Sequence, residues 1–536
     1  MAKTEIIYRD IAPGALEHVT PTIDDLQPFC DLNDLKKESI SPPQAATLER
    51  DYWRLDGSFE IFPDAPKGQN WGIWSQSMTE ADGTFTVPPV LTLTFTELFS
   101  SVGLTFSFNP YGPDWCNDMN VKWYRDSTLL AEEDFTPDDW EFQCIREVKL
   151  FNRIVITFRG MPKPYRYLKL QRVVYGIIRA FGPEEFRAVN LFQAASVISE
   201  ELEINTMDFT LSSKDPVPFM FQRKQPMELY HNATLQGVFY ISSSKRIGER
   251  VYEIQSSDLV GLLDENNHMG GIYDNVTFAE LAAEILAGYE YEIDAALVNV
   301  QLSGWLPIAT CRENLTQAAF AVGAIVDTSG SDRVRIFSPC TSPSADFDGE
   351  RVYAGSNIDT AALVTAVEVT EHKYTAGDET QELFNDTLNG TADITFSEPM
   401  HTLSITGGTI NKSGANYARI TGSGGTVVLT GAKYNHTTRT ITVNNPDVAA
   451  GEVVNVIQVT DVTLVSPGNS ESVAQRVYTH YQRRENVNAT LVLNSELPGD
   501  VVTISTEFDG VKTGTILSLD MDIARKKIGE VVVLCQ

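Results

Sequence analysis

Two short helices with strong N-terminal signals stand inside an otherwise strand-rich chain, and this order limits the possible folds more than any other feature. Thr277 and Glu280 occupy the ends of one capping box, and Thr310 and Glu313 occupy the ends of a second. In such a box the Thr hydroxyl accepts from the amide three residues later, while the Glu carboxylate accepts from the Thr amide. Apolar residues follow each box at helical spacing. The sequence therefore predicts two helices between strand-rich segments.

Other local signals extend this prediction. Asp258 is expected to cap a short helix that ends near Asp264, and Gly323 to end the second capped helix. Alternating apolar residues predict a hairpin of strands 237–241 and 250–254 across a turn at 242–248. Three further expectations are a register break at 205–208, a hairpin turn at 327–332 before a strand at 334–337, and a helix from Asn469 or Ser470 to Arg483 and Arg484.

Composition divides the 536 residues, of which 42% are hydrophobic, into segments of different kinds. Six of the seven tryptophans fall between residues 48 and 176, among period-two runs broken by Pro, Gly and Asp. This pattern predicts an antiparallel β-sandwich. Between about residues 378 and 465, Thr, Gly and Asn replace most aromatic residues, which predicts a compact all-β insertion. The chain is therefore expected to be mostly β and multidomain, with a small α/β lobe.

The charge balance bears on possible partners. The formal net charge is −31 and the isoelectric point is near 4.6. Because affinity for nucleic acid depends on Lys and Arg displacing counterions, no specific nucleic-acid binding is expected. The excess carboxylates are expected to keep a large strand-rich protein soluble, and an acidic wall would also let DNA pass without adhering.

The cysteines and the N-terminus indicate the compartment in which the chain is made. The six cysteines are scattered without a CxxC pair, as expected for reduced residues in a protein made in a reducing cytoplasm. The first ten residues lack the apolar core of a signal peptide, and no stretch has the length of a membrane span. Neither export by the usual route nor stable membrane insertion is expected.

Familiar catalytic motifs are missing from the sequence. It contains no HExxH, GxSxG, Walker A or GxGxxG motif, so no enzyme, no catalytic residue and no cofactor are predicted. The seven histidines are far apart, and no pair has the spacing of ligands on one helix face. The pairs Asp346/Asp348 and Asp520/Asp522 could each place two carboxylates on one strand face, but neither lies in a recognisable calcium loop. No metal site is predicted.

The tryptophan-rich segment offers one candidate binding surface. Aromatic faces stack against the C–H faces of sugars, and Tyr111, Trp115 and Trp140 fall in loop-like contexts. We take these three residues as candidate glycan contacts, with a purely structural role as the alternative. Trp71, Trp74 and Trp123 lie in strand-like contexts and are expected in the core.

Three passages after Leu202 occur in an order that is informative as a whole. The passages are the strand pair Gly237-Val-Phe-Tyr-Ile241 and Arg250-Val-Tyr-Glu-Ile254 with Asp258, the lobe with Trp305-Leu-Pro307, Thr310-Cys-Arg-Glu-Asn-Leu315 and Ala321-Val-Gly-Ala324, and the closing segment with Leu497-Pro-Gly-Asp500 and Gly514-Thr-Ile-Leu-Ser518. In this order they resemble the tail-hub proteins of bacteriophages. That family includes the baseplate hub of contractile phages and the tail-associated proteins at the tip of long-tailed phages.

The resemblance implies a fold and an assembly. Hub proteins have two similar β-barrels that flank a helical lobe, and three chains form a ring that can meet a hexameric tail tube. The implied domains are an N-terminal arm (1–46), a β-sandwich (47–176), hub barrel 1 (177–260), an α/β lobe (261–345), hub barrel 2 (346–377 and 467–536) and a β-rich insertion (378–466). The sandwich and the insertion are departures from the minimal hub.

The sandwich has a likeness of its own. Trp71-Gly-Ile-Trp-Ser75, the runs Val90 to Phe95 and Gly103 to Phe108, and Pro164-Tyr-Arg-Tyr-Leu-Lys-Leu170 to Gly176 resemble the strand series of a discoidin-type, galactose-binding-like jelly roll. Domains of that type are often carbohydrate-binding modules, and many others are structural.

Together the resemblances imply a structural subunit at the virion tail tip that is made in the host bacterial cytoplasm. The expected assembly is a homotrimer that caps the tail tube and gates the exit of DNA and the tape-measure protein. Its expected partners are a distal-tail or tail-tube ring protein, the tape-measure protein, and fibres or a host-surface glycan. The alternatives are a carbohydrate-binding adhesin of the tail tip and a tail-associated cell-wall hydrolase. The hydrolase is the weaker expectation, because no catalytic segment is seen before the sequence stops at Gln536.

Overall fold

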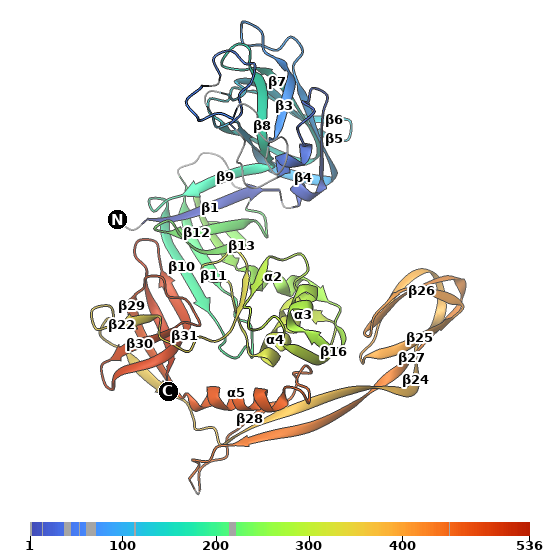
Figure 1. Ribbon diagram of the computed structural model, residues 1–536, viewed down its shortest axis with the longest axis vertical. Coiled ribbons are helices and arrows are strands. Elements are labelled where there is room, and N and C mark those ends of the chain that lie inside the picture. Colours follow the sequence, from blue (N-terminus) through green and yellow to red (C-terminus); the bar gives the residue numbers. More distant parts are fainter. Residues whose placement is uncertain are drawn as a thin grey trace. The chain divides into compact units, whose positions relative to one another are not determined.

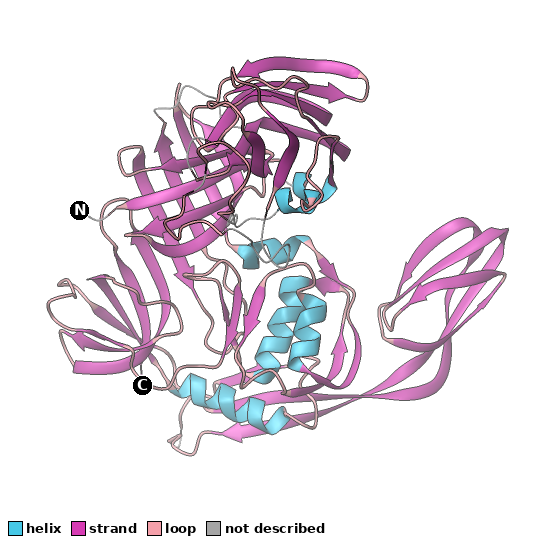
Figure 2. Ribbon diagram, turned by 45° about the horizontal axis from the view of Figure 1, so that its top comes forward, coloured by secondary structure: helices cyan, strands magenta, loops and turns pink. Residues whose placement is uncertain are grey.

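The chain divides into two compact units. The computed structural model describes residues 3–12, 14–36, 44–52, 54–60, 71–111, 114–213, 221–449 and 451–535. The first unit comprises Met1–Ile6, Gly182–Ser212 and Glu228–Gln536, and the second comprises Ile7–Phe181 and Ser213–Met227. Most residues in regular structure lie in strands, which confirms the mostly β, multidomain class (Figures 1 and 2). The predicted domain boundaries stay predictions.

The second unit is built on an antiparallel sheet in the order β3-β8-β4-β7-β5-β6, with β2 paired to β4. Its strands are β2 (Val19–Ile23), β3 (Ile73–Met78), β4 (Val90–Phe108), β5 (Asp118–Arg125), β6 (Thr128–Phe135), β7 (Glu141–Gly160) and β8 (Tyr167–Val174). Short helical turns α1 (Ala15–His18) and η1 (Leu32–Lys36) precede β3, and β9 (Gly176–Phe181) follows β8. Residues of the predicted N-terminal arm thus take part in this sheet through β2.

The core of the second unit is aromatic. Phe106, Phe108, Phe151 and Phe158 are fully buried in one cluster with Trp123. Each such side chain removes a large apolar area from water, and neighbouring rings gain further from edge-to-face contact. Trp71 and Trp74 are also buried, so the prediction that the strand-like tryptophans lie in the core is confirmed.

The main sheet of the first unit combines strands from two distant parts of the sequence. The order is β23-β29-β32-β31-β10-β11-β14-β13-β12, with β22 and β30 joined to β31 as a branch. The strands are β10 (Phe186–Ala194), β11 (Thr206–Ser212), β12 (Pro226–His231), β13 (Thr234–Arg246), β14 (Val251–Ser257), β22 (Ala345–Phe347), β23 (Asn357–Thr360), β29 (Glu485–Val492), β30 (Val501–Thr506), β31 (Gly510–Asp522) and β32 (Ile528–Cys535). β1 (Thr4–Ile11) begins in this unit.

The strands expected in the two hub barrels are therefore present as two halves of one sheet. The halves meet where β10 pairs with β31, from Asn190 opposite Asp522 to Ala194 opposite Ser518. Among the residues described, no sheet closes on itself, so the barrels appear as open sheets. The predicted hairpin of two strands forms, but β13 continues to Arg246, the turn is shorter than expected, and residues 252–254 pair with 244–246 rather than with 237–241. The exposed Ser and Lys residues there stay in the strand because the ladder with β14 satisfies their backbone groups.

The helical lobe lies between these halves in sequence. It contains α2 (Leu259–Leu262), η2 (Leu263–Glu265), α3 (Phe278–Ile285) and α4 (Cys311–Val322), with the short strands β15 (Asn267–His268), β16 (Gly271–Thr277), β17 (Tyr291–Ile293), β18 (Gln301–Leu306), β19 (Ala309–Thr310), β20 (Ile325–Asp327) and β21 (Val334–Phe337). Both capping boxes form, and Asp258 caps α2 by accepting from the Gly261 amide. Gly323 ends α4 at φ 79°, which favours glycine. These predictions are confirmed.

A long ribbon follows the lobe. β24 (Ala366–Thr395, 30 residues) pairs antiparallel with β27 (Tyr417–Asn444, 28 residues), and β25 (Met400–Thr406), β26 (Gly408–Ser413) and β28 (Val456–Val459) complete the five-stranded sheet (Figure 1). The all-β character is as predicted, whereas the two long strands replace the compact form expected. The predicted boundary at residue 378 falls inside β24. Helix α5 (Ser470–Gln482), also as predicted, packs on β24 and β27 through Val473, Ala474 and Val477.

Candidate functional site

A buried polar cluster joins the strands of the first unit to its lobe. Asn205, which is 1% exposed and directly precedes β11, accepts from the Ala194 amide at 2.8 Å. Its Nδ2 lies 3.1 Å from Asp327 Oδ1, 3.1 Å from Thr328 Oγ1 and 3.2 Å from Ser329 Oγ. One amide thus ties β10 to the turn that follows β20. The register break predicted at 205–208 is not found, because β11 begins only at Thr206 and pairs with β14 without a shift.

The same cluster holds two buried carboxyl groups. Thr328 Oγ1 donates to Asp258 Oδ2 at 2.5 Å, and Asp258 Oδ1 caps α2. Burial raises the pKa of Asp258 to about 7, partly offset by these hydrogen bonds. Burial also raises the pKa of Asp327, and Asp327 Oδ2 has no hydrogen-bond partner among the described residues. The junction between sheet and lobe thus contains two buried carboxyl groups whose pKa values burial raises.

The ribbon is fastened to the lobe by a second polar set. Trp305 Nε1 donates to Asn416 Oδ1 at 2.8 Å, and Asn416 Nδ2 donates to the carbonyls of Met269 and Leu306 at 2.9 and 2.8 Å. Asn416 is 1% exposed and directly precedes β27. Since a buried amide must be satisfied, these bonds fix the ribbon against the lobe.

Two histidines meet across the ribbon ladder, although they are distant in sequence. His372 Nδ1 lies 2.9 Å from His436 Nε2, and His372 Nε2 lies 3.0 Å from the Thr460 carbonyl. Because a carbonyl only accepts, His372 carries its proton on Nε2 and accepts from His436 through Nδ1. Burial lowers the pKa of His372, with a smaller effect from His436. The sequence missed this contact because it depends on the register of β24 and β27.

The three candidate glycan residues lie in connections between strands of the second unit. Trp115 is partly buried against the aromatic core, and Tyr111 and Trp140 are also only partly exposed. The Phe108 amide donates to the Trp140 carbonyl at 2.6 Å, which brings Trp140 beside the segment that leads to Tyr111 and Trp115. The Asn117 amide, two residues after Trp115, donates to the Gly160 carbonyl at 3.1 Å, at the opposite end of β7 from Trp140, so the three residues stay candidates for glycan contact. Residues 112 and 113 of the loop lie outside the described residues.

A buried ion cluster pins that loop. Lys169 Nζ lies 2.7 Å from Glu49 Oε2 and 2.8 Å from Asp114 Oδ2, and the side chains of these residues are at most 2% exposed. The Tyr52 ring lies 3.7 Å from the same ammonium, and Asn109 Nδ2 donates to the Tyr52 hydroxyl at 2.9 Å. Sequence reasoning missed this cluster, since lysine is rarely buried without partners that only the fold supplies.

The remaining candidates for chemistry are dispersed. Among the described residues, no three His, Cys, Asp or Glu side chains form a group that could hold a metal ion. Asp346 accepts from Thr503, and Asp348 accepts from the amides of Glu350 and Arg351, so these carboxylates serve turns and strands. The described cysteines are all free thiols. No helix among the described residues is long and apolar enough to cross a membrane.

Comparisons with known proteins identify only distant likenesses. No protein-family model and no curated protein matches the sequence. Among solved structures, a tail protein from Neisseria meningitidis is 11% identical with a TM-score of 0.42, covering 66% of this chain and 95% of that one. The prophage tail protein gp18 from Listeria monocytogenes is 12% identical with a TM-score of 0.41, covering 66% and 90%.

A third similar structure is a component of the E. coli type VI secretion system, described as structurally similar to the T4 bacteriophage tail proteins gp27 and gp5. It is 9% identical with a TM-score of 0.33, covering 66% of this chain and 73% of that one. Because these likenesses are distant, the function proposed below is built on this chain's own strands and contacts.

Proposed function

We propose that this chain is a structural subunit of a phage tail hub that acts as a homotrimer. The observation that carries the proposal is the pairing of β10 with β31. It joins a half-sheet made before the lobe to a half-sheet made after it, so that two strand-rich halves flank one helical lobe. This is the arrangement expected of a hub, in which two similar halves per chain let three chains present six similar surfaces.

The buried junctions support a mechanical rather than a chemical role. Asn205, Asp258 and Thr328 fasten the sheet to the lobe, and Asn416 and Trp305 fasten the ribbon to the lobe. Buried, satisfied polar networks fix one relative placement of the elements that they join. A subunit that must hold its shape under load benefits from such networks. The partners that we propose for it are a tail-tube or distal-tail ring protein and the tape-measure protein.

In this proposal the assembled ring caps the tail tube at the tip and gates the exit of DNA and the tape-measure protein. The net charge of −31 supports this role, because a wall with few Lys and Arg side chains gives DNA phosphates little to bind. In this proposal the acidic surface lets DNA pass because it does not bind the phosphates.

Native mass spectrometry and electron microscopy of the purified chain test the assembly. We expect a ring of three copies, and a stable complex when a tail-tube protein is added. The chain with Asn205→Ala serves as a control that loosens the junction and should lower the trimer yield. A monomer at all concentrations, with and without the tube protein, would refute the hub proposal.

A second proposed function is glycan recognition by the second unit. The observation that favours it is that Asp114, which directly precedes Trp115, is held by the buried Lys169, while the Trp140 carbonyl accepts from the Phe108 amide three residues before Tyr111. A loop held by buried charges loses little entropy on binding, so its aromatic residues are preorganised. A glycan array tests this function: binding should be lost in Trp115→Ala and kept in Trp305→Phe, whose ring lies in the lobe. An array without any signal for the unmodified chain would refute it.

A further inference from the structure

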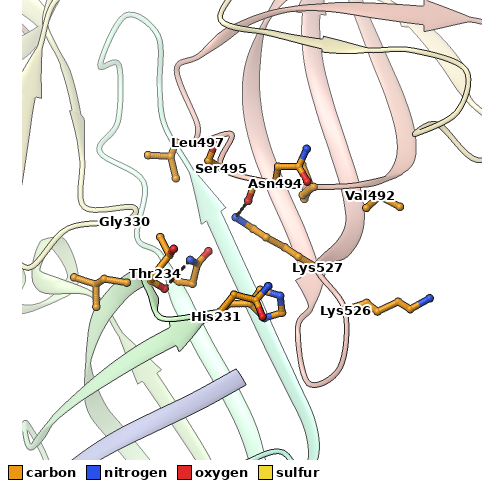
Figure 3. A pocket seen from close by; sticks show the side chains of 13 residues that line it. His231, Thr234, Gly330, Val492, Asn494, Ser495, Leu497, Lys526 and Lys527 are labelled. Atoms are coloured by element: carbon orange, nitrogen blue, oxygen red, sulfur yellow. Dashed lines mark hydrogen bonds between the residues drawn. The ribbon is translucent and has the colours of Figure 1, made fainter. Parts of the chain in front are cut away.

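A cavity of about 550 Å³ opens in the first unit where its two half-sheets and its lobe meet (Figure 3). Four segments line it: the turn between β12 and β13, the turn between β20 and β21, the loop between β29 and β30, and the turn between β31 and β32. The cavity is therefore assembled from parts of the sequence that only the completed sheet brings together.

The lining is basic in a chain that is acidic overall. Lys526, Lys527 and His231 line the cavity, and no Asp or Glu does. The chain as a whole has 72 acidic residues against 41 Lys and Arg, so a wall without any carboxylate is unusual here. The acidic residue nearest in sequence, Glu496, binds the Arg351 guanidinium at 2.7 Å, and its charge also acts on Lys527, where it partly offsets the effect of burial on the pKa.

Lys527 is the central feature of the cavity. Lys527 is 5% exposed, and its ammonium has three N–H donors. One donates to the Asn494 carbonyl at 2.9 Å, and this is the one hydrogen bond of that ammonium among the described residues. Burial lowers the pKa of Lys527, as expected for a cation short of partners. Two donors of a buried cation are thus left for a ligand.

The neighbouring groups are held in place and shape the rest of the site. Thr4 donates to the Ile523 carbonyl, so its hydroxyl accepts from His231 Nδ1 at 2.8 Å and fixes that ring. Asn232 accepts from the Lys3 amide at 3.0 Å, which leaves its side-chain N–H groups for other partners. Leu235 and Leu497 form an apolar part of the cavity wall. A ligand that fits combines one negative group with an apolar stem.

We propose that this cavity binds an oxyanion, supplied as a carboxylate on an apolar stem, namely a glutamate side chain of another protein. A free phosphate shares the oxyanion chemistry but has no stem to contact Leu235 and Leu497. The proposal is independent of the tail-hub function, because the site exists in a single chain and is tested with a small probe.

The test is a ligand-observed NMR titration of the full chain with N-acetyl-glutamate amide, at constant ionic strength. N-acetyl-glutamine amide is the uncharged control, and inorganic phosphate tests the second source of an oxyanion. We expect binding of the glutamate probe, none of the glutamine probe, and weaker binding of phosphate. Equal binding of the glutamate and glutamine probes would overturn the site, and tighter binding of phosphate would overturn the carboxylate assignment.

Three variants connect binding to the cavity. Lys527→Met keeps the approximate length of the side chain. It should weaken the binding of the glutamate probe at least about tenfold, as expected for the loss of a hydrogen bond to a charged group. Val492→Asp places a carboxylate at a wall position that is 38% exposed, and should abolish binding even if Lys527→Met disturbs folding. The matched control is Lys245→Met, on an exposed lysine of β13. Unchanged binding in Lys527→Met or Val492→Asp would overturn the proposal.

Discussion

Asn205 offers the sharpest test of the junction between sheet and lobe. We consider two substitutions of this side chain. Asn205→Ala removes both the oxygen that accepts from the Ala194 amide and the nitrogen that faces Asp327. Asn205→Asp keeps the shape and the accepting oxygen, but replaces the donor with a second carboxyl group beside Asp327. Comparing the two variants therefore separates the effect of losing the side chain and its accepting oxygen from the effect of introducing a charge.

The magnitudes follow from the contacts. An amide left unpaired in the interior costs about 1–3 kcal/mol, and loss of the contact to Asp327 with the small cavity adds to this. We expect Asn205→Ala to lower the local free energy of unfolding by roughly 3–5 kcal/mol at neutral pH. Asn205→Asp should destabilise the junction less at low pH, where the introduced carboxyl group is protonated and can donate to Asp327.

The sign of the pH effect is fixed by burial. In the folded chain, burial and Asp327 raise the pKa of the introduced carboxyl group above its value in the unfolded chain, near 4. The folded state then binds more protons than the unfolded state above that pH, so stability falls as the pH rises. The penalty of Asn205→Asp relative to the unmodified chain should therefore be larger at pH 8 than at pH 5.

Hydrogen–deuterium exchange read by mass spectrometry measures this locally. After correction for intrinsic rates, a loss of 3 kcal/mol corresponds to roughly a hundredfold faster exchange, since 1.4 kcal/mol is a factor of ten. The change should appear in peptides that contain Ile325 and Phe337, while peptides of the second unit serve as the internal control. A penalty for Asn205→Asp that is equal at pH 5 and pH 8 would refute the reasoning.

Three further predictions concern buried ionisable groups. Because the pKa of Asp258 is raised to about 7, the folded first unit should lose stability as the pH rises from about 4 to 7, and Asp258→Asn should flatten this slope in urea unfolding curves. Lys169→Met should destabilise the second unit by about 3–5 kcal/mol in calorimetry, because it leaves two buried carboxylates without their cation. Arg419→Ala removes an exposed ion pair and should change the stability little. His372 should titrate below its ordinary pKa of 6.5 in NMR spectra, so its contribution to stability is lost as the pH falls, and His436→Ala should raise that pKa.

Local signals were read well from the sequence. The capping boxes at Thr277 and Thr310 and the cap at Asp258 depend on residues within one helical turn, so their chemistry is complete in the sequence. The hairpin of β13 and β14 was found for the same reason, although its turn was placed too early. In that turn, polar residues indicated a loop, while the ladder with β14 decided the conformation.

The non-local features could not be read in this way. The contact of Asn205 with Asp327 and the pairing of β10 with β31 join residues that no periodicity links. The burial of Lys169 could not be predicted because it depends on Glu49 and Asp114, which come from two other segments. The ribbon was expected to be compact because a two-stranded ladder exposes both faces, which weakens the alternation that marks a long strand.

The place of β10 in its sheet also determines when this chain can finish folding. One edge of β10 pairs with β11 soon after it leaves the ribosome, but the other edge waits for β31, about 330 residues later. At a bacterial rate of roughly 5–20 residues per second, that edge stays unpaired for about 15–65 s. An open strand edge invites pairing with other chains. Nascent copies are therefore exposed to premature association in polysomes, and a chaperone that shields residues 186–194 during synthesis would raise the yield of correctly folded chains.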